Sequence, residues 1–134
     1  METWDFRCDL EVRDYEIDMQ GVVNHAIYLN YLEYSRALFI RQLGINVYDM
    51  HNRGFDVMVA KLEQEYKYSL RPNDKFYILL RVRKEGRVRF IFDHEIRRLD
   101  DTLILTARVT IICLNLKTGR VCVPDEFIKY FTKK

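Results

Sequence analysis

Residues 12–36 decide the fold, and they read Val-Arg-Asp-Tyr-Glu-Ile-Asp-Met-Gln-Gly-Val-Val-Asn-His-Ala-Ile-Tyr-Leu-Asn-Tyr-Leu-Glu-Tyr-Ser-Arg. The stretch begins at the end of an alternating strand pattern, breaks at residues 18–21, and passes through Asn24 and His25 into an amphipathic helix. This order predicts that the carboxylate of Asp18 lies close to the free backbone N–H groups of a helix start. Such a junction can polarise a carbonyl while the carboxylate attacks it or activates water.

The same residues resemble a known family signature. The pattern Asp18-x-x-Gly21-x-Val23-x-His25-x-x-Tyr28 is similar to that of the 4-hydroxybenzoyl-CoA thioesterase family of the hotdog-fold superfamily. The resemblance covers nearly the whole chain, because a helix ending at Leu43-Gly44, long strands and a terminal Val123-Pro124-x-x-Phe127 also have counterparts there. It implies an α+β hotdog fold, in which an antiparallel sheet of five or six strands curls around one long central helix. We expect a single hotdog thioesterase domain over residues 1–134.

Composition narrows the class of protein. With 134 residues the chain is long enough for one domain with a real core. Its 22 basic and 20 acidic residues leave a formal net charge of +2, which gives no global attraction to nucleic acid or to an anionic membrane. The three cysteines lack metal-ligand spacing, and no stretch predicts an export signal or a membrane span. We therefore expect a cytoplasmic protein with reduced thiols and with neither nucleic acid nor membrane as partner.

The helix that follows His25 is predicted from about Ala26 to Leu43, with Asn24 as its N-cap and Gly44 just after its end. One arc of the helical wheel is apolar and is predicted to pack on the sheet; it contains Tyr28, Leu29, Leu32, Phe39, Ile40 and Leu43. Arg36 falls inside this arc. It must either extend its guanidinium to solvent or be paired, and Glu33 is the nearest candidate partner.

Alternating patterns predict the strands 6–17, 57–69, 76–83, 87–98, 103–114 and 121–123, with a helical turn over 127–131. In 57–69 one face should be wet, and Met58 and Leu62 should share the other. The run 103–114 is the most apolar and should be a central strand. His94, on an otherwise apolar face, is predicted to be a core histidine. The order strand, long helix, several strands agrees with an antiparallel sheet around one helix.

The resemblance implies an acyl-CoA thioesterase without cofactor or metal. Asp18 would be the nucleophile or the general base, and the backbone N–H near His25 would bind the thioester oxygen. Gly21 would keep the approach to the carbonyl open, and Tyr28 would line the acyl pocket. The side chain of His25 either orients Asp18 or water, or has no role beyond its backbone. The local sequence alone favours a turn-forming role for Asp18, and the whole ordered motif favours the catalytic role instead.

Other chemistries find little support in the sequence, which has no phosphate loop, Cys-x-x-Cys, zinc helix or serine elbow. An acyl-acyl carrier protein thioesterase and a non-catalytic module that binds acyl thioesters remain open alternatives. A dehydratase is a weaker one. Basic residues gather between 81 and 89, where Arg87 and Arg89 either contact coenzyme A phosphates or belong to a solvated hairpin. A homodimer or homotetramer is expected, because a single curled sheet leaves an edge exposed.

Overall fold

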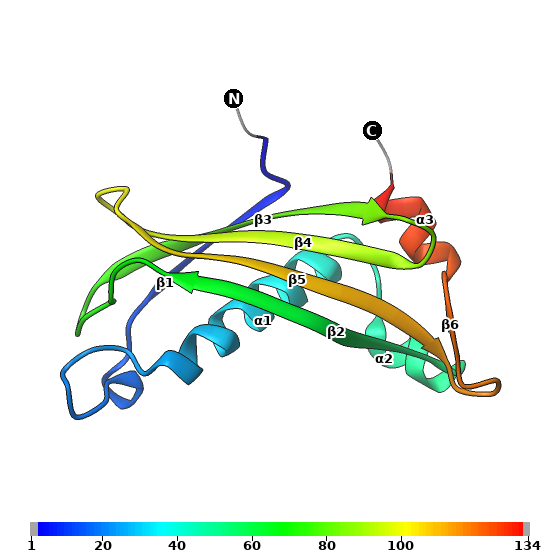
Figure 1. The fold of residues 1–134 in the computed structure, drawn as a ribbon, viewed down its shortest axis with the longest axis horizontal. Helices are drawn as coiled ribbons and strands as arrows, with labels where there is room; N and C mark the ends of the chain where they lie inside the picture. The colour runs from blue at the N-terminus through cyan, green and yellow to red at the C-terminus, as the bar shows by residue number, and fades with distance from the viewer. Residues whose placement is uncertain (1–2, 133–134) are drawn as a thin grey trace.

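A long helix lies across one face of a curled antiparallel sheet in the computed structural model, which describes residues 3–132 (Figure 1). The helices are the 3-10 turn η1 (Asp14–Glu16), α1 (His25–Gln42), α2 (Val47–Asn52) and α3 (Asp125–Phe131). The strands are β1 (Phe6–Glu11), β2 (Phe55–Tyr66), β3 (Lys75–Glu85), β4 (Arg89–Arg98), β5 (Leu103–Asn115) and β6 (Arg120–Cys122). They are ordered β1-β3-β4-β5-β2, and β6 pairs with the end of β5. The predicted hotdog arrangement is confirmed.

Helix α1 begins and ends where the sequence predicts, within one residue. The side chain of Asn24 accepts a 2.9 Å hydrogen bond from the backbone of Ala26, which satisfies one of the free donors of the first turn. Gly44 has φ +92°, a conformation that favours glycine and ends the helix. The buried face differs in part from the predicted arc, because Tyr31 and Ser35 are buried whereas Leu29 is 39% exposed.

The apolar core has two clusters, and α1 passes from one to the other. The first surrounds Tyr28, Tyr31 and Leu32 at the start of the helix. The second surrounds Phe39 near its end and includes Phe127 of α3. The first cluster therefore supports the helix start near Asp18, and the second holds the opposite end of the sheet.

Two strand predictions need correction. The strand predicted over 6–17 ends at Glu11, because the chain turns into η1 before Asp18. In β2 the pairing register shifts between Val59 and Lys61, so Met58 and Leu62 do not share a face. Most residues of β2 are exposed on both sides, since β2 is an edge strand that pairs only with β5. The predicted single wet face is therefore wrong. The central, largely buried position of β5 is confirmed.

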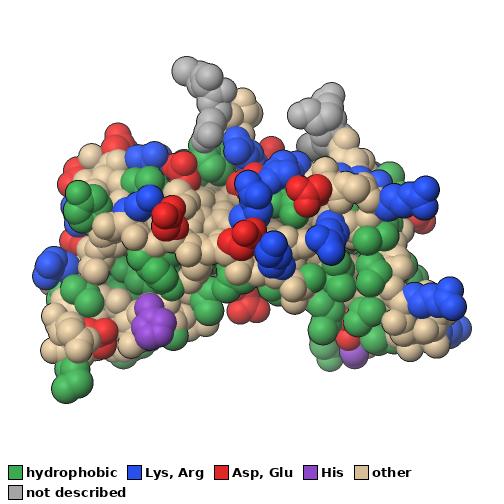
Figure 2. All heavy atoms as spheres, in the orientation of Figure 1, with side chains coloured by type: hydrophobic (Ala, Val, Ile, Leu, Met, Phe, Trp, Pro, Cys, Tyr) green, Lys and Arg blue, Asp and Glu red, His purple; other side chains and the backbone are tan. Residues whose placement is uncertain are grey.

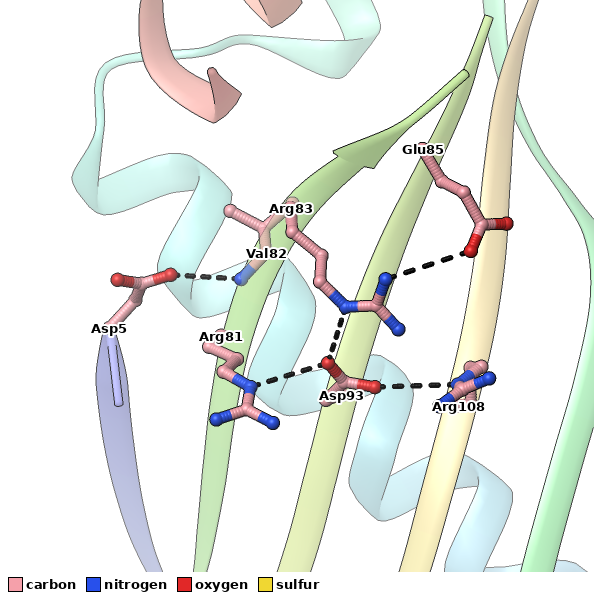
Figure 3. A network of polar contacts seen from close by, with 7 residues as sticks. All are labelled: Asp5, Arg81, Val82, Arg83, Glu85, Asp93 and Arg108. Atoms are coloured by element: carbon pink, nitrogen blue, oxygen red, sulfur yellow. Dashed lines mark hydrogen bonds and ion pairs between the residues drawn. The ribbon is translucent and has the colours of Figure 1, made fainter. Parts of the chain in front are cut away.

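The sheet face that turns away from α1 carries an ion-pair network (Figure 3). Asp93 on β4 accepts from Arg83 Nε at 2.9 Å and from Arg81 Nε at 3.3 Å, and Arg108 Nε lies 3.6 Å away. Basic and acidic side chains are correspondingly interspersed over the upper middle of the face seen in Figure 2. The charges on this face are thus largely matched within the chain.

Candidate active site

Asp18 lies in a tight turn between η1 and α1 whose shape is fixed by backbone hydrogen bonds. The N–H of Asp18 donates to the carbonyl of Val22 at 2.9 Å, and the N–H of Gly21 donates to the carbonyl of Asp18 at 3.0 Å. Gly21 has φ +80°, so the turn needs a residue that tolerates the left-handed region. One carboxylate oxygen of Asp18 accepts from the backbone of Gln20 at 2.9 Å. Asp18 is therefore both a turn-forming residue and a positioned, partly exposed carboxylate.

The start of α1 offers a free donor beside this turn. The N–H of Ala26 donates to the Asn24 side chain, and the N–H of Ile27 donates to the Asn24 carbonyl at 2.9 Å. Within residues 3–132 we find no hydrogen-bond acceptor for the N–H of His25. This N–H sits at the positive end of an 18-residue helix, where a developing negative charge is stabilised.

Asp18 and His25 line the same cavity of about 270 Å³. Its other walls are Val22, Val23, Tyr28 and the segment 66–69 at the end of β2. Tyr28 is buried, and its hydroxyl accepts a 2.9 Å hydrogen bond from the backbone of Leu70. Burial raises the pKa of this hydroxyl, so it stays protonated at physiological pH. The His25 ring is exposed.

The buried carboxylate of Glu16 lies next to the turn and connects it to α1. Glu16 is 6% exposed and accepts hydrogen bonds from the Tyr31 hydroxyl at 2.6 Å and from the backbone of Arg13 at 2.8 Å. The carbonyl of Glu16 accepts from the backbone of Asn24 at 3.1 Å, which connects η1 to the N-cap of α1. The sequence did not predict these contacts of Glu16. The only signal is that Glu16, a charged residue, falls on the face that is apolar in the preceding alternation.

The structure places Arg87 and Arg89 far from Asp18 of the same chain. They lie in the β3–β4 hairpin, beside α3, whereas Asp18 follows β1 at the other end of the sheet (Figure 1). The register pairs Glu11 with Lys75 at one end of β3 and Glu85 with Arg89 at the other. This separation is roughly 30 Å for an extended strand of this length. Within one chain the hairpin and Asp18 are therefore not parts of one pocket.

Arg36 and His94 are brought together between α1 and the sheet. The Arg36 Nη1 atom lies 3.3 Å from His94 Nε2, and no ion pair joins Arg36 to Glu33. Of the two alternatives left open for Arg36, pairing with Glu33 is not formed, because the helix turns the guanidinium toward the sheet. The prediction that His94 is a core histidine is confirmed, since the side chain is 2% exposed.

No group of three or more His, Cys, Asp or Glu side chains in residues 3–132 is arranged to hold a metal ion. None of the helices in that part of the chain is long and apolar enough to cross a membrane.

Comparison with known proteins gives a consistent family match. The model of the thioesterase-like superfamily matches residues 12–131. An acyl-acyl carrier protein thioesterase of Arabidopsis thaliana chloroplasts, ATL3, is 34% identical over 92% of this chain and 65% of its own length. The chain thus spans just under two thirds of that relative. The acyl-CoA thioester hydrolase YbgC of Escherichia coli is 25% identical over 98% of both chains. The crystal structure of a DHNA-CoA thioesterase from Staphylococcus aureus superimposes with a TM-score of 0.79 at 28% identity, covering 93% of this chain and 82% of that one.

Proposed function

The chain belongs to the thioesterase-like superfamily, and from this premise we propose that it is a thioester hydrolase that converts an acyl-CoA to the free acid and CoA. One observation carries the proposal: Asp18 and the unpaired N–H of His25 line one cavity. A thioester carbonyl placed there would have a carboxylate on one side and a helix N-terminus at its oxygen. Thiolate is a good leaving group, so no strong general acid is required.

In this mechanism Asp18 acts as nucleophile or as general base. As nucleophile it attacks the carbonyl carbon, expels the CoA thiolate and forms a mixed anhydride that water then hydrolyses. As general base it takes a proton from the water that attacks the same carbon. In both routes negative charge develops on the thioester oxygen, which the N–H of His25 stabilises. Gly21 allows the tight backbone turn at Asp18, and Tyr28 lines the part of the cavity that would hold the acyl group.

The test is a panel of acyl-CoA, acyl-carrier protein and acyl-pantetheine thioesters, with the released thiol measured. Hydrolysis of acyl-CoA that is abolished by Asp18→Asn supports the proposal. Binding of the same thioesters by the wild-type protein without any thiol release would instead identify a non-catalytic binding module. The panel includes 4-hydroxybenzoyl-CoA, because the pattern from Asp18 to Tyr28 supports a place near that family within the superfamily.

An acyl-carrier protein thioesterase is the second candidate, and the similarity to ATL3 favours it. The two candidates differ in what holds the far end of the thiol arm. Coenzyme A presents free phosphates, whereas a carrier protein presents its own surface. A lower KM for the carrier-bound substrate than for the CoA ester of the same acyl group would establish this second candidate.

We also propose that the working unit is a homodimer or homotetramer of single-domain chains in the cytoplasm. The free edge of β2 is 12 residues long, and its exposed apolar side chains are Met58, Val59, Leu62 and Tyr66. Such an edge is commonly covered by self-association. A second copy there would also border the cavity, because Tyr66 lines it. Sedimentation at micromolar concentration that finds an active monomer would refute this.

A further inference from the structure

A polar cluster interrupts the apolar contact between α1 and the sheet. Gln64 on β2, Ala107 on β5 and His94 on β4 stand in one row across the sheet, since Ala107 is the register partner of both. Ala107 is small, so it leaves room between the two polar side chains. Arg36 of α1 closes the cluster from the helix side through its contact with His94.

Arg36 brings an uncompensated charge into this cluster. Burial lowers the pKa of Arg36, and the charge of Glu33 acts in the opposite direction without forming an ion pair. A guanidinium has five N–H donors and stays protonated in proteins, so most of its donors remain for another partner. No carboxylate oxygen in residues 3–132 lies within 4.0 Å of Arg36.

His94 adds a second donor. Arg36 can only donate, so His94 Nε2 accepts and the neutral ring carries its proton on Nδ1. Burial and then the charge of Arg36 lower the pKa of His94 to about 3, which keeps the ring neutral at physiological pH. Nδ1 is buried, and no hydrogen bond of standard geometry joins it to residues 3–132; the backbone of Leu79 lies close enough to raise the pKa of the ring in part.

Gln64 can supply a third donor. Its Nε2 donates to the Tyr66 hydroxyl, and its Oε1 is buried without a partner in the described part of the chain. Rotating the side-chain amide of Gln64 by half a turn exchanges the positions of Oε1 and Nε2. Oε1 then accepts from the Tyr66 hydroxyl, and Nε2 points into the cluster. All three side chains then present N–H groups around a net positive charge, which is the chemistry that recognises an anion.

Tyr66 connects the cluster to the site that holds Asp18. Along β2, Val59, Leu62 and Tyr66 are 53%, 40% and 46% exposed, although their register partners on β5 are buried in the core. Within a single chain the inner face of β2 is thus uncovered beside Arg36, which is itself partly exposed. Tyr66 lines the cavity of Asp18, contacts the carbonyl of His25 at 3.4 Å and is bonded to Gln64. An acyl chain that extends from Asp18 past Tyr66 and along β2 would run toward the three donors.

We propose that Arg36, His94 and Gln64 bind a terminal carboxylate on the acyl group, so that the substrates are CoA monothioesters of dicarboxylic acids. This assignment rests on the proposed thioester hydrolysis. A carboxylate fits better than a neutral oxygen because it supplies the negative charge that Arg36 lacks and can accept from several donors at once. A methyl end would leave these donors buried and unpaired.

The test compares substrates of equal chain length that differ only at the far end: adipoyl-, suberoyl- and sebacoyl-CoA against hexanoyl-, octanoyl- and decanoyl-CoA. We expect kcat/KM to favour the carboxylate-ended member of at least one pair by about tenfold or more, as loss of a charged hydrogen bond gives. Arg36→Met should remove this preference while hydrolysis of the methyl-ended ester persists. Arg36→Lys keeps the charge and should retain part of the preference. Arg41→Met, at an exposed arginine of the same helix, is the matched control and should change nothing.

Three results would overturn the carboxylate site: an equal loss on both members of every pair in Arg36→Met, a wild-type preference for the methyl ends, or a stronger preference for 8-hydroxyoctanoyl-CoA than for suberoyl-CoA. If the wild type hydrolyses no thioester, the proposed function fails by itself. The site is then decided by calorimetric binding of suberate against octanoate. Binding of suberate that is lost in Arg36→Met supports the site, and equal binding of the two acids rejects it.

Discussion

The hydroxyl of Tyr31 on α1 donates a 2.6 Å hydrogen bond to the carboxylate of Glu16, which is buried just before the turn that carries Asp18. This contact joins the helix that supplies the free N–H to the turn that supplies the carboxylate. Burial and the bond to Glu16 raise the pKa of Tyr31. The relative position of the two groups proposed for the reaction therefore depends on a residue pair that need not touch the substrate.

Tyr31→Phe should lower both stability and kcat. The substitution removes one of the two hydrogen bonds to Glu16, which we expect to cost about 1–2 kcal/mol of unfolding free energy. Urea denaturation measures this cost, and steady-state kinetics should show a fall in kcat that exceeds any change in KM. Tyr34→Phe is the control, because Tyr34 is exposed on the same helix. Equal effects of the two substitutions would show that the contact with Glu16 does not matter.

Asp18→Asn keeps the shape of the turn and removes the charge. Turnover should fall by several orders of magnitude, since loss of an essential nucleophile or base has that effect. The circular dichroism spectrum and binding of the substrate should be preserved, because Asn can still accept the hydrogen bond from Gln20. More than about a tenth of the wild-type rate in the variant would exclude Asp18 from the chemistry.

His25→Pro tests the backbone donor directly. His25 is the first helical residue, where proline is tolerated and where its missing N–H breaks no helical hydrogen bond. Asn24 already has the extended conformation that a following proline requires, with φ −63° and ψ 141°. We expect kcat to fall by about 10²–10³, as for loss of an oxyanion donor. His25→Ala keeps the N–H and serves as the control. If alanine is as harmful as proline, the side chain is the working group.

Charge reversal at Arg87 and Arg89 tests the β3–β4 hairpin as a phosphate contact. If these residues bind coenzyme A, their replacement by Glu should raise KM for acyl-CoA with little change in kcat, because the contact is equal in ground and transition states. Added salt should reduce the difference, and an acyl-pantetheine thioester should be unaffected. The hairpin lies at the opposite end of the sheet from Asp18 of its own chain, so an effect would require the hairpin of another subunit. Equal losses on both substrates would indicate a structural role.

Asp93→Asn should destabilise the sheet, and more so than an exposed control. Burial alone would raise the pKa of Asp93, but hydrogen bonds from Arg83 and Arg81 outweigh it and hold the pKa below its usual value. The contribution of Asp93 to stability is therefore present above the unfolded pKa near 4 and is lost as the pH falls through the lower folded pKa. We expect a loss of about 1–3 kcal/mol at pH 7. This difference from wild type should shrink below pH 4 in urea titrations. Asp9→Asn, which removes an exposed pair with Arg7, should cost less than about 1 kcal/mol.

Local patterns were sufficient to predict most of the elements, because capping and alternation depend on neighbouring residues. Asn24 and Gly44 bound α1 as predicted, and the run 103–114 forms the central strand β5. The turn at Asp18 and the cavity shared with His25 also follow from that local order.

The errors have non-local causes. The register shift after Val59 reverses the alternation of β2, and a pattern of period two cannot show an extra residue. The guanidinium of Arg36 meets His94, which is 58 residues away in the chain. The distance between Arg89 and Asp18 depends on which end of β3 pairs with the end of β1 that precedes Asp18. Local sequence patterns do not contain that information.

The walls of the cavity come from two separate segments of the chain, and this has a consequence for how the substrate preference can change. The reacting carboxylate and the free N–H both come from the short segment between Asp18 and His25, which is fixed by its own backbone hydrogen bonds. The opposite wall, residues 66–69, belongs to the end of β2 and the loop after it. Substitutions in that wall can alter which acyl groups fit without disturbing the Asp18 carboxylate or the N–H of His25. In the proposed hydrolase, new substrate preferences are thus accessible by single substitutions, in evolution as in protein engineering, while the groups proposed for the reaction stay unchanged.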